Sequence, residues 1–381
     1  MKHRIVFVGD LFPTEKNLPF FVEGDCLSLF GKDICDLLQT ADLRFCNLEG
    51  ALTDHEERCK KTGPVKVAPA QAVKAYKQLG IDCCLLANNH VTDGGTAGMV
   101  DTIKTLDEAG IDHLGAGVSN EDLSHLAYYS IGEKTVGLYN VSETMYNKAT
   151  ADSAGVWLYD EYLVCKELEE ARRKSDYLIV IYHGGIEKFP YPSPEIRKRF
   201  HRMADSGADV VVAQHTHCVG CEEVYNGCYC LYGQGDFLLK NFAPGLTDSG
   251  LILEIEFQND KVQVRKHLVH SVDDMFVRYS EPQDFTAFDD RSKKVSDESF
   301  VFNEFQKFCD NELKLYLTAF KNPSKWRLRQ GRLFPSSYLK WLYNYSERNL
   351  LFTLHTFRSE QNRETAIIGI DHLLNKRWNH E

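Results

Sequence analysis

The chain has 381 residues, 43% hydrophobic and 26% charged, and this ordinary globular composition excludes a disordered chain, a collagen and a coiled coil. No stretch approaches the roughly 18 to 20 uncharged apolar residues of a membrane span. The net charge of −11 is uneven, because residues 291–381 hold 16 Lys and Arg against 10 Asp and Glu. Residues 1–290 therefore carry a strong negative charge, which argues against non-specific nucleic-acid binding and suits a site that gathers carboxylates around cations.

The amino terminus and the cysteines bear on the cellular compartment. The apolar run Ile5–Val8 is too short for a secretory signal and ends in Gly9–Asp10, so it predicts a first buried strand. The twelve cysteines lie in apolar or helical contexts, which favours reduced thiols and a cytoplasmic protein. The pairs Cys218/Cys221 and Cys228/Cys230 are better explained by a hairpin than by a zinc site, because their spacing is not that of a zinc knuckle.

Short apolar runs alternate with helical patterns up to about residue 260, which predicts βαβ units and mainly parallel pairing. The predicted strands, in chain order, are Arg4–Val8, Leu43–Asn47, Cys83–Ala87, Lys134–Val141, Tyr177–Tyr182, Val210–Ala213, Cys228–Tyr232, Leu251–Phe257 and Val262–Leu268. The predicted helices are Leu27–Gln39, Pro69–Leu79, Thr96–Ala109, Tyr159–Lys174 and Ser193–Ser206.

The character of the chain changes after about residue 270. Residues 281–299 are polar and contain Pro282, so residues 271–299 are predicted to be a linker or long loop. Residues 300–381 are aromatic-rich and helical in pattern. The prediction is a main α/β domain over residues 1–270 and a helical extension over residues 300–381.

Polar side chains cluster where the predicted strands end. In open α/β sheets, ligands bind at the carboxyl ends of the strands. Five apolar strands each deliver Asp, Glu, Asn or His at that end. These residues are Asp10; Asn47 and Glu49; Asn88, Asn89 and His90, with Asp93 one turn on; His183 and Glu187; and His215 and His217.

Carboxylate, amide and imidazole together are the ligands of divalent Mn, Fe and Zn ions. The set exceeds the needs of one tetrahedral ion and fits two ions that share a carboxylate, about 3.5 to 4 Å apart. Each residue also has an ordinary explanation: Asp10 as a turn or helix cap, Glu49 as a solvated loop residue, Asn88 and Asn89 as turn formers. His215 and His217 are harder to explain in this way, because alternation in an extended segment puts both imidazoles on one side.

The order of these motifs resembles the capsule-biosynthesis CapA family, whose domain is called PGA_cap, a branch of the calcineurin-like metallophosphoesterases. The resemblance covers about residues 1–260. It rests on Gly9–Asp10, Asn47–Leu48–Glu49, Leu86–His90 with Asp93 and Gly95, Gly115–Gly117, His183–Glu187, Gly207–Asp209, His215–His217 and Tyr232–Phe237. The resemblance implies a four-layer αββα sandwich with a site for two divalent metal ions.

The resemblance also implies roles for individual residues. Asp10 and His217 would bind the first ion, Asn89, His183 and His215 the second, and Glu49 would stand where the superfamily has a bridging Asp. His90 would be the general acid or transition-state donor, oriented by Asp93. Asn88, Glu187 and Asp236 are assigned to the substrate, with Asp236 either an extra ligand or a turn residue.

Three functions follow from these observations. The first is a metal-dependent hydrolase that acts on a phosphate ester, either a small molecule or an anionic polymer. The second, implied by the family, is a factor in the synthesis or processing of a capsule polymer such as poly-γ-glutamate. The third is a non-catalytic binding module. It is motivated by Phe12, which stands where the superfamily's first motif has a His, and by the altered second motif at Asn47–Glu49.

Overall fold

The computed structural model describes residues 3–59, 64–119, 121–143, 149–150, 153–239, 247–258, 261–321, 333–342 and 344. The chain forms two compact units, residues 1–305 and residues 306–381. The first unit holds both large sheets and the candidate site.

The first sheet is built around the amino-terminal strand. Its central strands are parallel to one another, and an antiparallel meander extends one edge. The order is β18 (Phe276–Tyr279), β17 (Lys261–Val272), β16 (Ser249–Gln258), β1 (His3–Leu11), β2 (Leu43–Leu48), β5 (Cys83–Leu85) and β6 (Asp112–Leu114), with β15 (Asp236–Leu238) also paired to β1.

The second sheet has a parallel centre with antiparallel strands at both edges. Its order is β13 (Glu222–Tyr225), β14 (Cys228–Leu231), β12 (Val210–Gln214), β11 (Tyr177–His183), β9 (Lys134–Ser142) and β8 (Leu126–Ile131). Two short pairs stand apart from the sheets. They are β3 (Ala51–Leu52) with β4 (Val67–Ala68), and β7 (Ala116–Gly117) with β10 (Gly155–Val156).

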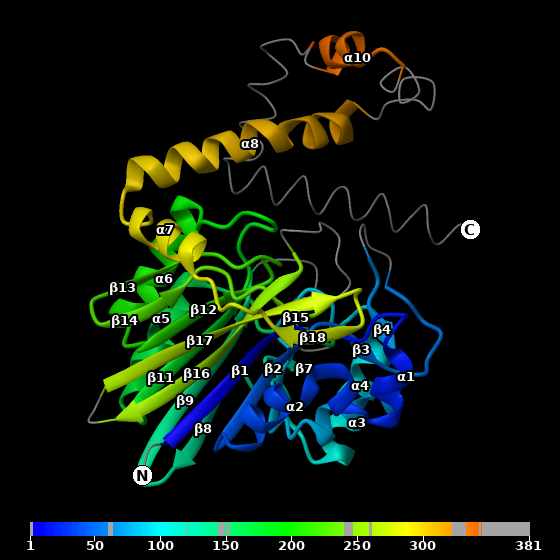
Figure 1. The fold of residues 1–381 in the computed structure, drawn as a ribbon, viewed down its shortest axis with the longest axis vertical. Coiled ribbons are helices and arrows are strands. Elements are labelled where there is room, and N and C mark those ends of the chain that lie inside the picture. Colours follow the sequence, from blue (N-terminus) through cyan, green and yellow to red (C-terminus); the bar gives the residue numbers. More distant parts are fainter. Residues whose placement is uncertain are drawn as a thin grey trace. The chain divides into compact units, whose positions relative to one another are not determined.

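The two sheets pack face to face, and helices cover their outer faces (Figure 1). Along β1 the side chains alternate, as the period of a strand requires: Phe7 belongs to the core between the sheets and Val6 to the core beneath the helices. The first sheet is covered by α1 (Leu18–Glu23), α2 (Cys26–Gln39), the 3-10 turn Ala70–Ala72, α3 (Val73–Gln78) and α4 (Gly95–Ala109). The second is covered by α5 (Glu161–Arg172) and α6 (Pro194–Asp205). The predicted αββα sandwich is confirmed.

Each of the nine predicted strands and five predicted helices has a counterpart in the structure. The predicted helix Pro69–Leu79 begins as the 3-10 turn and continues as α3. The short elements α1, β6 and β15 were not predicted, because three to six residues carry too little hydrophobic periodicity to be recognised.

The prediction of a linker or long loop over residues 271–299 is wrong. This segment contains β18, α7 (Thr286–Lys294) and the start of α8 (Glu298–Lys321). β18 pairs with β17, and Phe288 of α7 is buried in the core between the sheets. Because α7 buries little more than Phe288, the rest of its sequence is polar. This polar composition is the reason why a loop was predicted.

All twelve cysteines are free, as reduced thiols predict. Cys228 and Cys230 lie on β14 of the predicted hairpin, whereas Cys218 and Cys221 precede it. Burial raises the pKa of the Cys218 thiol to about 12, which favours an apolar packing role over metal binding.

The second unit contains most of α8 and the helix α10 (Pro335–Leu342). The remainder of the predicted helical extension lies outside the described residues. Among the described helices, none combines the length and the apolar character that a membrane crossing requires.

Candidate metal centre

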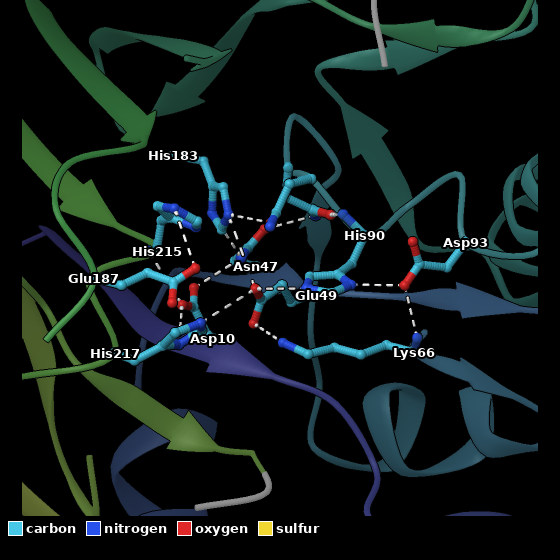
Figure 2. Close-up of polar contacts among 12 residues, drawn as sticks. Asp10, Asn47, Glu49, Lys66, His90, Asp93, His183, Glu187, His215 and His217 are labelled. Carbon is cyan, nitrogen blue, oxygen red and sulfur yellow. Dashed lines mark hydrogen bonds and ion pairs between the residues drawn. The ribbon is translucent and has the colours of Figure 1, made fainter. Parts of the chain in front are cut away.

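The ends of strands from both sheets meet at one cluster of polar side chains (Figure 2). The first sheet contributes Asp10 from β1 and the residues that follow β2 and β5. The second sheet contributes His183 at the end of β11 and the two histidines that follow β12. The six residues assigned to the metal ions are brought together and are buried: Asp10, Glu49, Asn89, His183, His215 and His217.

The carboxylate of Glu49 lies at the centre of the cluster. Its Oε1 is 3.8 Å from His90 Nε2, 3.9 Å from His183 Nε2 and 3.8 Å from His217 Nε2. The residue is fully buried, and its Oε1 accepts no hydrogen bond from the described residues. A buried carboxylate oxygen that lacks a donor is costly, so this arrangement calls for a cation at Oε1.

Several imidazoles are held on the side that faces away from Glu49. His90 Nδ1 lies 2.6 Å from Asp93 Oδ2, and His217 Nδ1 lies 2.8 Å from Asp236 Oδ1. A carboxylate on one ring nitrogen directs the other nitrogen toward Glu49, the usual arrangement at metal sites. His183 Nε2 lies 3.0 Å from Asn89 Oδ1, so these two predicted ligands also converge.

Two groups of side chains meet the distance requirement for a shared ion. Glu49, His215 and His217 form one group, and Asp10, His217 and Asp236 form the other; within each, the ligand atoms all lie within 4.8 Å of one another. His217 belongs to both groups. Asp236 therefore lies where it can serve as a ligand or hold His217.

Tight backbone packing places Asp236 beside Asp10. β15 runs parallel to β1, with Asp10 and Asp236 in register. A Cβ on Gly9 would lie 2.4 Å from the carbonyl oxygen of Gly235, so only glycine allows the two backbones to approach this closely. The glycines of the sequence motifs thus act by bringing carboxylates together.

His215 and His217 do not lie on an extended segment, which corrects the prediction made from their alternation. β12 ends at Gln214, and the two histidines have positive φ angles of 86° and 54°. Such backbone conformations are uncommon outside glycine and cluster at functional sites. The turn nevertheless brings both rings to the cluster, with their centroids 5.9 Å apart.

Asn88 and Glu187, assigned to substrate from the sequence, have different surroundings. Asn88 is fully buried, and its amide donates to Asn47 Oδ1 at 3.0 Å and to the carbonyl of Leu48 at 2.8 Å. This makes it a support of the loop after β5. Glu187 lies half-exposed, with its Oε1 3.8 Å from His215 Nε2. Substrate binding by either residue stays a prediction.

Sequence reasoning missed two residues of the centre, Lys66 and Glu143, and gave no role to a third, Asn47. Asn47 donates to Asp10 Oδ1 at 2.7 Å, Lys66 forms an ion pair with Glu49 Oε2 at 2.7 Å, and Glu143 Oε1 lies 3.6 Å from His215 Nε2. Asn47 was already named at its strand end, and Glu143 follows β9 as the predicted ligands follow their strands. Lys66 could not be recognised in this way, because it directly precedes β4 of the short β3–β4 pair and does not follow a strand of a large sheet.

The charges of the centre are strongly coupled. Burial, together with Glu49 and Asp236, raises the pKa of Asp10 to about 8. Burial alone would lower the pKa of His217, but Asp236 and Glu49 outweigh it and raise that pKa to about 10. Burial and the neighbouring His217 lower the pKa of His215 to about 3. Burial opposes ionisation of Glu49, but Lys66 and the histidines lower its pKa below the usual range.

Glu143 is predicted to support His215. Its carboxylate is largely buried and faces His215 Nε2, while His215 Nδ1 is buried without a hydrogen-bond partner among the described residues. Removing such a supporting carboxylate typically weakens metal binding about 10- to 100-fold. Glu143→Gln is expected to weaken Mn²⁺ binding by about tenfold, measured by calorimetric titration. Glu187→Gln is the matched control, because that more exposed carboxylate should matter little; equal effects of the two variants would contradict this role for Glu143.

Comparison with known proteins identifies the family. Residues 4–241 match the family model described as bacterial capsule synthesis protein PGA_cap, which covers more than half of the chain. The chain belongs to the PGA_cap family. The family is related to the calcineurin-like metallophosphoesterases, so the resemblance seen in the motifs is confirmed.

Two curated relatives of this chain are named CapA. The chain is 30% identical over 191 residues to the capsule biosynthesis protein CapA of Bacillus anthracis, covering 49% of this chain and 46% of that protein. It is 30% identical over 186 residues to the PGA biosynthesis protein CapA of Bacillus subtilis, covering 48% and 49%. The matched region thus spans about half the length of these relatives.

Solved structures with a similar arrangement include two proteins named as phosphate-ester enzymes. One is a putative 5'-nucleotidase from Staphylococcus aureus, with a TM-score of 0.48 and 15% identity, covering 78% of this chain and 58% of that chain. The other is a phosphatase from Mycoplasma pneumoniae, with a TM-score of 0.47 and 11% identity, covering 76% and 99%.

Proposed function

We propose that this PGA_cap protein is a metal-dependent hydrolase that acts on a phosphate ester. The proposal depends on one observation. Three imidazole Nε2 atoms lie 3.8 to 3.9 Å from Glu49 Oε1. Oxygen and nitrogen donors of this kind suit Mn²⁺, Fe²⁺ or Zn²⁺. Glu49 Oε1 accepts no hydrogen bond from the described residues, which supports the fit.

Two divalent ions are proposed, in keeping with the two donor groups. Asp10 and His217, with Asp236, would hold one ion, and Asn89, His183 and His215 would hold the other, with Glu49 between them. When bound, such ions supply positive charge for phosphoryl oxygens and lower the pKa of bound water. The protein supplies the donors and keeps them buried.

His90 and Asp93 would serve the leaving group. The Nε2 of His90 points toward Glu49, while its Nδ1 is held by Asp93 at 2.6 Å. In its protonated form, with a proton on both ring nitrogens, an imidazole oriented in this way can donate the Nε2 proton to the oxygen of a departing alcohol. The backbone N–H of Lys66 also donates to Asp93 Oδ2, at 2.6 Å, and so fixes the orienting carboxylate.

Hydrolysis can be tested with generic substrates. Metal-free protein is loaded with Mn²⁺, and release of nitrophenol from bis(p-nitrophenyl) phosphate and from p-nitrophenyl phosphate is followed. Turnover that depends on Mn²⁺ and is lost with EDTA is expected. Metal binding without turnover of any phosphate ester would contradict the proposed hydrolysis. The protein would then be a binding module with a phosphoesterase-like fold.

A second candidate is suggested by the printed names of the relatives. Two are named for capsule or PGA biosynthesis, and a Mycobacterium tuberculosis relative is named a probable polyglutamine synthesis accessory protein. An anionic polymer linked through γ-glutamyl amides would then be the substrate. Mass spectrometry of poly-γ-glutamate incubated with the Mn²⁺-loaded protein distinguishes the two candidates, because only the second yields shortened chains.

Metal binding should stabilise the protein, and more so at higher pH. A ligand at 100 times its Kd stabilises the native state by about 2.7 kcal/mol. In the metal-free protein the pKa values of Asp10 and His217 are raised to about 8 and about 10, so both hold protons at neutral pH. An ion must displace these protons, and the displacement becomes easier as the pH rises. The increase in Tm caused by Mn²⁺ should therefore be larger at pH 8 than at pH 6.5; an increase that shrinks with pH would contradict this account.

A further inference from the structure

Lys66 is a buried cation placed directly on the central carboxylate. Its Nζ lies 2.7 Å from Glu49 Oε2, and its side chain is only 10% exposed. In Figure 2 it reaches Glu49 from the side of Asp93, away from Asp10. Burying the charge of a lysine is costly, so its position beside a fully buried carboxylate is specific.

Local structure fixes this position. β3 and β4 pair with Ala51 opposite Val67, and the N–H of Ala51 donates to the carbonyl of Lys66 at 3.0 Å. Lys66 is thereby held across from the residues that follow Glu49. Its own N–H donates to Asp93 Oδ2 at 2.6 Å, which ties it to the loop that carries His90.

The two oxygens of Glu49 consequently face different partners. Oε2 is paired with Lys66, while Oε1 faces the three imidazole nitrogens. Among the ion pairs of the described residues, Lys66 is the only Lys or Arg that contacts Asp10, Glu49 or Asp236. Lys66 thus places a permanent positive charge of the protein itself at Glu49.

We propose that Lys66 is a built-in cation of the centre, which holds Glu49 Oε2, leaves only Oε1 for divalent ions and weakens their binding. The inference rests on the proposed metal centre. A unit positive charge beside the bridging carboxylate repels an incoming ion, and the repulsion is stronger in the interior than in water. The same charge stabilises the metal-free protein, where Glu49 would otherwise be buried without a permanent cation.

Three variants separate charge from shape. Lys66→Met removes the charge and keeps most of the volume, and Lys66→Arg keeps the charge. Lys104→Met removes a charge from α4, where the side chain is 71% exposed, and controls for the change in net charge. Mn²⁺ binding to metal-free protein is measured by calorimetric titration, or by competition with EDTA if Lys66→Met can be isolated only with Mn²⁺.

The expected result is that Lys66→Met binds Mn²⁺ at least about tenfold more tightly than the wild type, because a repelling charge next to the ion is gone. Lys66→Arg and Lys104→Met should stay within about threefold of the wild type, because both keep the charge at the centre. Equal or weaker binding by Lys66→Met would overturn the proposal, since it would make Lys66 neutral or helpful to the ions.

Stability of the metal-free protein provides a readout that does not depend on any ion. Lys66→Met and Glu49→Gln should each lower Tm, and the double variant should be more stable than the sum of the two effects predicts, because it buries no unpaired charge. Additive effects would overturn the role of Lys66. Failure of the wild type to bind Mn²⁺ would instead overturn the metal-dependent function, while this cycle would still decide whether Lys66 neutralises Glu49.

Discussion

Replacing His217 with glycine is expected to abolish stable metal binding and to lower Mn²⁺-dependent hydrolysis by about 10³-fold or more, because His217 belongs to both donor groups. Its Nδ1 is held by Asp236 and its Nε2 faces Glu49 Oε1. Loss of the ring therefore removes a proposed ligand. It also increases the mutual repulsion among the three buried carboxylates around it. Among the residues that the structure describes, His217 alone belongs to both groups.

Glycine removes the whole side chain at a backbone with a φ of 54°, a conformation that glycine adopts readily. Alanine is made in parallel, because it keeps the Cβ and the strain of roughly 1 to 2 kcal/mol that His217 already has, and so separates loss of the imidazole from relief of that strain. Metal content is measured by inductively coupled plasma mass spectrometry and activity with bis(p-nitrophenyl) phosphate. His113→Gly on β6 serves as the control outside the cluster. Wild-type metal content in His217→Gly would contradict the proposed centre.

Replacing His90 with glutamine is expected to separate chemistry from metal binding. His90 Nε2 is 3.8 Å from Glu49, but His90 belongs to neither donor group, and its Nδ1 is committed to Asp93. Loss of a positioned proton donor typically costs 10²- to 10⁴-fold in rate, so kcat should fall by about this factor. Mn²⁺ affinity should change by less than about threefold, because the ligands remain.

Two further measurements make this prediction specific. Asp93→Asn should also lower the rate, because a neutral amide no longer stabilises the protonated imidazole that donates from Nε2. A substrate whose leaving group is already a good one, such as nitrophenolate, should lose less rate in His90→Gln than an alkyl phosphate ester. Equal losses with both leaving groups would argue against proton donation, and a parallel loss of bound metal would make His90 a ligand.

Much of the main domain could be predicted from local sequence. Apolar runs such as Val210–Ala213 form strands because both faces of a central strand are buried, and this leaves a continuous hydrophobic signal. The polar residues directly after these runs could be assigned to one edge because parallel strands present their carboxyl ends together. The segment 271–299 could not be predicted in the same way, because Phe288 anchors α7 through a contact with a core that the local sequence does not describe.

The sequence by itself indicated the family through its motifs, the order of layers through that resemblance, and the candidate donor residues through the residue types that follow each strand. Only the tertiary structure decided which atoms meet: Asp236 beside Asp10, Lys66 on one oxygen of Glu49, and the imidazoles around the other. The physical reason is that these contacts join residues from separate sheets and loops, brought together by close backbone packing and buried charge pairing, and neither leaves a periodic trace along the chain.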